Sequence, residues 1–170
     1  AALLQDREQG ADVIVLPETF TSGFSNAALG KAESMDGESV EWLRKMAATC
    51  NSAITGSVQI RDGGRLFNRM LWAMPDGRMH YYDKRHLFRM ADEHLRYAAG
   101  TDRITIDYKG WRICPMVCYD LRFPQLYRAL AESGCSILSV PAAFTRQTGE
   151  AHWTVLLRAR AIETGSFVLA

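Results

Sequence analysis

The middle of the chain holds two hairpin patterns in direct succession, and they restrict the fold more than any other feature of the sequence. The apolar segments SAITGSVQI (52–60) and LFNRMLWAM (66–74) flank the turn RDGGR, and PDGR joins the second segment to MHYYDK (79–84). Glycine-containing turns between runs of this kind are typical of β-hairpins. We therefore expect three consecutive antiparallel strands between residues 52 and 84.

Helical and strand patterns alternate on both sides of this region. Helices around a strand-rich middle indicate a layered α/β fold. Two architectures fit, a four-layer αββα sandwich and an open doubly wound sheet, and the hairpins favour the mixed sheets of the sandwich. We expect one helix that ends at Gly10 and three further helices over residues 38–50, 124–134 and 149–165. The further expected strands are residues 13–16, 103–108, 111–117, 136–140 and 166–170.

Composition narrows the class of protein. With 170 residues, of which 48% are hydrophobic, the chain suffices for one well-buried domain, so we expect residues 1–170 to form a single domain. The 20 basic and 19 acidic residues are mixed along the chain, so neither nucleic acid nor an anionic membrane is indicated as a partner. No apolar run approaches the roughly 20 residues that span a bilayer, and no signal segment is visible. We expect a cytoplasmic protein that binds a small molecule or another protein.

The four cysteines are too scattered for a disulfide framework, and C-x3-C at Cys114 and Cys118 has no second pair with zinc spacing. We therefore expect no metal. Side-chain alternation would place Cys114 and Cys118 on one face of a strand, but four extended residues separate them by about 13 Å, too far for a disulfide.

Three residues that could carry chemistry each follow an apolar strand. Glu18 comes after VIVLP, Lys84 after MHYYD and Cys118 after ICPMV. In α/β sheets, ligands bind at the carboxyl ends of strands. If these strands are neighbours, a carboxylate, an ammonium and a thiol meet in one pocket.

This trio suits nucleophilic attack on an amide. Glu18 can accept the thiol proton, Lys84 can stabilise negative charge, and the N–H of Tyr119, directly after Cys118, can help to hold an oxyanion. Each residue also has an ordinary interpretation: a strand-end cysteine is often a small core residue, a loop glutamate is often solvated, and a lysine often protects a strand edge. It is the combination of the three that favours catalysis.

The segments VIVLPETF, YYDKRHLF and VCYDLRFPQLYR, in this order, resemble the three signature segments of the nitrilase, or carbon-nitrogen hydrolase, superfamily. VPAAFT followed by TGEAHWTVLLRARAIET is similar to the segment after the cysteine in its short amidase branches. The resemblance covers essentially the whole chain. It implies an αββα sandwich and cofactor-free hydrolysis through a cysteine thioester, with Glu18 as base, Lys84 as oxyanion-stabilising residue and Cys118 as nucleophile.

The resemblance also implies supporting residues around the trio. A second glutamate between the lysine and the cysteine orients the lysine and the substrate, and Glu93 in MADEHLRYAAG fits this position best. Asp120 and Arg122 in CYDLRFP are expected to support the nucleophile turn, although such a pair is also ordinary at a helix entrance.

The amidase branch that the chain most resembles is that of the omega-amidases, which hydrolyse the terminal amide of 2-oxoglutaramate and similar monoamides. TFTSGF and KRHLFRMADEH carry this likeness, whereas PAAFTRQTGEAHW is shared with amidases of deaminated glutathione. An aliphatic nitrilase is a further possibility. An anionic substrate needs a cationic recess, for which Arg85, Arg89 and Arg146 are candidates, with Phe144 beside them.

Family members form dimers through helices after the cysteine, so we expect a homodimer or higher homo-oligomer in which Trp153 and Leu157 are anchors. The same residues would also serve to cover the sheet. Family chains usually have one more strand before the first helix and several after SFVLA, so the sequence predicts an incomplete sandwich. This leaves a non-enzymatic alternative, an inactive truncated module for dimerisation or binding.

Overall fold

The computed structural model describes residues 10–24 and 30–170. The helix expected before Gly10 lies outside these residues. The strands are β1 (Val13–Val15), β2 (Ala53–Asp62), β3 (Arg65–Ala73), β4 (Met79–Asp83), β5 (Ile106–Tyr108), β6 (Trp111–Pro115), β7 (Ile137–Ser139) and β8 (Phe167–Leu169). The α-helices are α2 (Glu38–Cys50), α3 (Pro124–Ala131), α4 (Arg146–Thr148) and α5 (Thr154–Thr164), and short 3-10 turns occupy Arg89–Ala91, Glu93–Leu95 and Cys118–Arg122.

The strands form two four-stranded mixed sheets, as the hairpins indicated. The first sheet has the order β1-β2-β3-β4, in which β1 pairs parallel with β2 and the other pairs are antiparallel. The second has the order β5-β6-β7-β8, in which only β5 and β6 are antiparallel. The two expected hairpins are confirmed as β2-β3 and β3-β4.

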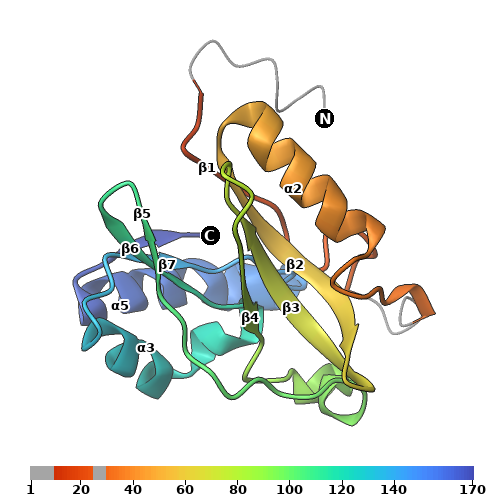
Figure 1. Cartoon of the computed structure of the whole chain (residues 1–170). Helices are drawn as coiled ribbons and strands as arrows, with labels where there is room; N and C mark the ends of the chain where they lie inside the picture. The colour runs from red at the N-terminus through yellow and green to blue at the C-terminus, as the bar shows by residue number, and fades with distance from the viewer. Residues whose placement is uncertain (1–9, 25–29) are drawn as a thin grey trace.

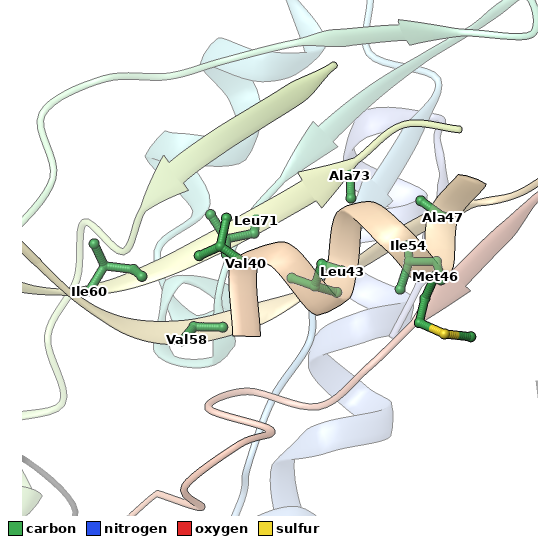
Figure 2. Close-up of a cluster of buried hydrophobic side chains, with 9 residues drawn as sticks. All are labelled: Val40, Leu43, Met46, Ala47, Ile54, Val58, Ile60, Leu71 and Ala73. Carbon is green, nitrogen blue, oxygen red and sulfur yellow. The ribbon is translucent and has the colours of Figure 1, made fainter. Parts of the chain in front are cut away.

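Helices cover the outer faces of the two sheets, which gives the expected αββα sandwich (Figure 1). Helix α2 lies against the first sheet, and Val40 and Leu43 on its inner face pack on Ile54 and Leu71 of β2 and β3 (Figure 2). The helix ends at Cys50, and the left-handed backbone of its C-cap residue, Asn51, returns the chain toward β2.

A second apolar layer joins the two sheets, and a third lies between the second sheet and the helices α3 and α5. Met70 and Trp72 of β3 meet Ile113 of β6 in the layer between the sheets. Leu126 and Leu130 of α3 pack on Leu138 of β7 in the third layer. The site residues described below lie at one end of the layer between the sheets.

The region expected as one helix over 149–165 has a different course. The helical path begins earlier, at Arg146, where the Thr145 hydroxyl accepts the Thr148 N–H as an N-cap. A π-helical turn, Gly149–Trp153, then precedes α5. A π-helical turn inserts an extra residue that the apolar spacing does not record, so periodicity could not locate it.

Candidate active site

Cys118 stands on a tight turn directly after β6. Its φ is 45°, in the left-handed region that residues other than glycine seldom adopt. The turn is held because the Cys118 N–H donates to the carbonyl of Pro141 at 3.0 Å, just after the neighbouring strand β7. Cys118 is buried, with a relative exposure of 7%. The fold therefore keeps a strained backbone at this cysteine.

Glu18 follows β1 and is also buried. The next residue, Thr19, has φ 45°, and its N–H donates to the Ser57 hydroxyl at 2.7 Å. This turn directs the Glu18 carboxylate inward, where Oε2 accepts the Ala143 N–H at 3.0 Å. Ala143 lies in the loop after β7, so the contact joins the two halves of the sandwich.

Lys84 reaches the same point from the opposite edge of the first sheet. Strands β1 and β4 run in the same direction with two strands between them, so their backbones are about 14 Å apart. The long side chains of Glu18 and Lys84 cover this gap, and Lys84 Nζ lies 2.8 Å from Glu18 Oε1. Both side chains are almost fully buried. Cys118 comes from the other sheet, so the expected meeting of strand ends occurs across two sheets and not along one.

Glu93 also lies at the Lys84 ammonium. Lys84 Nζ lies 2.9 Å from Glu93 Oε2, and the Phe88 N–H donates to the same oxygen at 2.6 Å. The amide of Asn68 donates to both Glu18 and Glu93. The structure thus brings together Glu18, Lys84, Cys118 and Glu93.

Burial and neighbouring charges set the protonation of the lysine and the thiol. Burial alone would lower the pKa of the Lys84 ammonium, but the carboxylates of Glu18 and Glu93 outweigh it and raise that pKa. Burial raises the pKa of the Cys118 thiol well above its ordinary value, and the charge of Glu18 raises it further, although Lys84 opposes this shift. At neutral pH the site therefore holds an ammonium and a protonated thiol.

Asp120 ties the nucleophile turn to the segment around Lys84. Its Oδ2 accepts the Tyr82 hydroxyl at 2.9 Å and the Val117 N–H at 3.1 Å. Its Oδ1 accepts the His86 N–H at 2.9 Å and lies 2.7 Å from His86 Nδ1. The His86 ring also stacks on Phe123, with ring centroids 3.7 Å apart. One buried carboxylate therefore connects both sheets next to the thiol.

A small cavity of about 150 Å³ opens beside the thiol. Arg122 and Phe144 line it, and the Arg122 guanidinium lies over the Phe144 ring. Arg85, Arg89 and Arg146 do not line it: Arg85 donates to the Thr101 carbonyl, and Arg146 is exposed and paired with Glu150. The cavity is lined by Phe24, Phe88, Ala91, Cys118, Tyr119, Arg122, Ala143, Phe144, Thr145 and Thr148.

The expectation that Cys114 and Cys118 lie on the same face of one strand is wrong. Cys114 packs between the second sheet and its helices, whereas Cys118 packs between the two sheets. The two do not share a strand face, because β6 ends at Pro115 and the alternation of side chains ends with it. Cys114 is therefore a core residue on the far side of the sheet.

Sequence reasoning missed Asn68, His86 and the Ala143 N–H. Asn68 had a visible signal, because it is a polar residue at an inward position of the run LFNRMLWAM. His86 and Ala143 had none, since their roles arise only when the two sheets face each other.

Among the described residues, no group of three or more His, Cys, Asp or Glu side chains is placed to hold a metal ion. No helix in this part of the chain is long and apolar enough to cross a membrane.

Comparison with known proteins places this arrangement in a family. The carbon-nitrogen hydrolase family model matches residues 2–170. This chain belongs to the carbon-nitrogen hydrolase family. Among solved structures, the carbon-nitrogen hydrolase XC1258 from Xanthomonas campestris has a TM-score of 0.93 and 52% identity, over 98% of this chain and 65% of that one. That protein was solved with an arsenic adduct in its active site.

Relatives within the carbon-nitrogen hydrolases carry amidase names. The chain is 47% identical over 159 residues to the omega-amidase YafV of Escherichia coli K12. This match covers 94% of this chain and 60% of the relative. It is 35% identical over 170 residues to the 2-oxoglutaramate amidase of Bacillus subtilis, covering 98% of this chain and 65% of the relative. The chain thus spans less than two thirds of the length of these relatives.

Proposed function

We propose that this chain carries the catalytic centre of an amidase that hydrolyses the terminal carboxamide of a small dicarboxylic monoamide such as 2-oxoglutaramate. The observation that carries the proposal is the contact of Glu18 with Lys84 beside the thiol of Cys118, next to a cavity of about 150 Å³. The names of the relatives support the choice of substrate class.

The first half-reaction forms a thioester. Cys118 Sγ attacks the amide carbon while Glu18 takes the thiol proton, and the negative charge on the carbonyl oxygen is held by Lys84 Nζ and the Tyr119 N–H. Glu18 then gives its proton to the nitrogen as the C–N bond breaks. Ammonia leaves, and the acyl group remains on sulfur.

The second half-reaction restores the enzyme. Glu18 takes a proton from water, the hydroxide attacks the thioester carbon, and the same oxyanion site holds the second tetrahedral intermediate. The C–S bond breaks, the thiolate recovers the proton from Glu18, and the carboxylic acid leaves. Glu93 keeps the ammonium of Lys84 in place through both steps.

The raised pKa of Cys118 shapes the first step. Because burial and the charge of Glu18 both favour the neutral thiol, the resting site does not store a thiolate. The proton must therefore move to Glu18 as the sulfur attacks.

Substrate selection falls to Arg122 in this proposal. Among the described residues that line the cavity, Arg122 is the one with a charged side chain. It is fixed by an Nη2 contact of 3.0 Å to His152 Nδ1. A guanidinium at this place can bind the far carboxylate of the substrate in two parallel hydrogen bonds.

We further infer that the chain associates with a second copy through α5. Trp153 and Leu157, expected as anchors, pack against the core of their own sheet. The outer face of α5 instead exposes Val155 and Ile162, seven residues apart on one side of the helix. Sedimentation of the Val155→Glu variant should show a monomer, and a mass equal to that of the unchanged chain would contradict this interface.

The proposal is tested by ammonia release from 2-oxoglutaramate, with butyramide and butyronitrile as probes that lack the far carboxylate. We expect release from the anionic amide, and none with Cys118→Ala. Arg122→Gln should lower kcat/KM for 2-oxoglutaramate by about 10- to 100-fold, the value of a charged hydrogen bond, and leave butyramide nearly unchanged. Arg146→Gln is the matched control and should resemble the unchanged protein.

Other outcomes would replace the proposal. Faster turnover of butyronitrile than of either amide would identify a nitrilase. Preference for deaminated glutathione over 2-oxoglutaramate would identify the other amidase branch. A folded protein that releases no ammonia from any of these amides would favour a binding or dimerisation module.

A further inference from the structure

Asn68 is a buried amide in the middle of an apolar strand. It lies on β3, opposite Gln59 of β2, and is 1% exposed. Met70 and Trp72, on the same face of this strand, belong to the apolar layer between the sheets. Burying an amide among such residues costs free energy unless its hydrogens find acceptors. The position therefore calls for a reason beyond packing.

The two hydrogens of the Asn68 amide both go to carboxylates. Nδ2 donates to Glu18 Oε1 at 2.8 Å and to Glu93 Oε1 at 3.1 Å. These contacts also fix the orientation of the amide, because the opposite orientation would turn its oxygen toward two carboxylate oxygens. Asn68 lies between the strands that supply Glu18 and Lys84, so its side chain stands under the point where they meet.

The amide relieves a shortage of donors at this point. Lys84 has three N–H groups, and it already serves Glu18 and Glu93. If it alone held both carboxylates, it would have less capacity to donate to a developing oxyanion. A second donor shared by the same two carboxylates leaves one N–H of Lys84 available for the substrate.

A neutral donor suits this place better than a charged one. Glu18, Glu93 and Lys84, the two carboxylates and one ammonium that meet here, carry one formal negative charge together. A cation at position 68 would cancel this charge and form an ion pair with the carboxylate that has to accept the Cys118 proton. An apolar residue would leave two close carboxylates with a single donor between them.

We propose that Asn68 is a positioning residue that sets the orientation of the general base Glu18 and keeps Lys84 available for the oxyanion. This inference rests on the proposed function for its catalytic meaning, but its effect on the thiol can be measured without an amide substrate. The hydrogen bonds of the Asn68 side chain go to Glu18 and Glu93 and not to Cys118, and Asn68 does not line the cavity, so it acts through the two carboxylates.

The test compares Asn68→Leu, which keeps the volume and removes both donors, with Thr55→Val. Thr55 lies on β2, is buried, and donates its hydroxyl to the Leu71 carbonyl without reaching either carboxylate. Circular dichroism and unfolding midpoints establish folding. Asn68→Asp, which keeps the shape and replaces the donor by an acceptor, serves as the second variant if the leucine variant does not fold.

Two readouts are used, the rate of alkylation of Cys118 by iodoacetamide at pH 7 and the kinetics of ammonia release. For Asn68→Leu or Asn68→Asp we expect alkylation at Cys118 to slow by about 10- to 100-fold, and kcat to fall by a similar factor with little change in KM. Alkylation of Cys50, which is remote on α2, should not change, and Thr55→Val should match the unchanged protein in both readouts.

The outcomes separate this inference from the proposed function. Unchanged alkylation of Cys118 in a folded Asn68 variant would overturn the inference, as would an equal slowing in Thr55→Val. Slower alkylation in a chain that releases no ammonia would support the role of Asn68 and reject the amidase. A higher KM with unchanged kcat would also overturn the inference, because it would place Asn68 in substrate binding.

Discussion

Replacing Asp120 by alanine should lower the free energy of unfolding by about 4 kcal/mol. The side chain is fully buried, and it accepts hydrogen bonds from the Tyr82 hydroxyl, the Val117 N–H and the His86 N–H. Alanine would leave these donors without their acceptor. Water cannot enter such a site freely, so the loss is not recovered by hydration.

The magnitude follows from the burial of each donor. A buried donor that loses its partner costs about 1–3 kcal/mol. Tyr82 and Val117 are fully enclosed and contribute in full, whereas the side chain of His86 is 28% exposed, so this segment recovers part of its loss from water. Burial and the charge of Asp120 also raise the pKa of Tyr82 well above its ordinary value, so its hydroxyl stays a donor at any pH of interest.

The assay is urea unfolding followed by tryptophan fluorescence, with midpoint and slope determined for both proteins. Asp107→Ala is the matched control, because Asp107 is an exposed aspartate paired with Arg112 and should contribute less than about 1 kcal/mol. A loss below about 1 kcal/mol for Asp120→Ala would refute the reasoning, since it would mean that the donors find other partners. A loss of the expected size with an unchanged rate of Cys118 alkylation would limit the role of Asp120 to stability.

Three further predictions concern stability. Burial, with the charges of nearby carboxylates, raises the pKa of Tyr97 to about 12, so the stabilising contribution of this tyrosine is complete below about pH 10 and is lost as the pH rises to about 12. The difference in urea midpoint between the unchanged protein and Tyr97→Phe should therefore shrink over this interval. A constant difference would contradict the raised pKa. Gly100→Ala should cost about 1–3 kcal/mol in urea unfolding, because a Cβ there would overlap the Asp83 carbonyl, whereas Gly30→Ala, with open space, should cost much less. Leu43→Ala should lower the unfolding free energy by about 2–5 kcal/mol, because Leu43 lies at the centre of the layer under α2, and a loss near zero would indicate that this layer is loosely packed.

Local patterns predicted the elements well, because hairpin turns and the apolar spacing of α2 depend on neighbours in the sequence. The residues of the trio could also be named, since each follows an apolar strand. Their route to one point could not be derived, because it depends on how the two sheets face each other. The sequence therefore favoured Arg85, Arg89 and Arg146 as the cationic recess, whereas Arg122 is the arginine that lines the cavity in the part of the chain that the structure describes.

Some features have no local signal at all. The π-helical turn 149–153 interrupts a segment whose composition is that of an ordinary helix. The left-handed backbone of Cys118 and Thr19 is held by hydrogen bonds to Pro141, in the loop after β7, and to Ser57 on β2, both of which are far away in the sequence. Asn68 did carry a signal, an amide at an inward strand position, and such a residue should be weighed as a site candidate whenever polar strand ends lie nearby.

Because the site is assembled from both sheets, the reactivity of the Cys118 thiol can serve as a probe of when the sheets dock during folding. The hydrogen bond from Lys84 to Glu18 joins residues that are 66 positions apart in the sequence, and the hydrogen bond from Ala143 to Glu18 joins residues that are 125 positions apart. Contacts of such long range form late, after the short-range hairpins. In a refolding experiment with brief pulses of alkylating reagent, the reactivity of Cys118 should therefore reach its native value only when the two sheets have docked. The chemical group proposed for catalysis would then report the last step by which the chain acquires its structure.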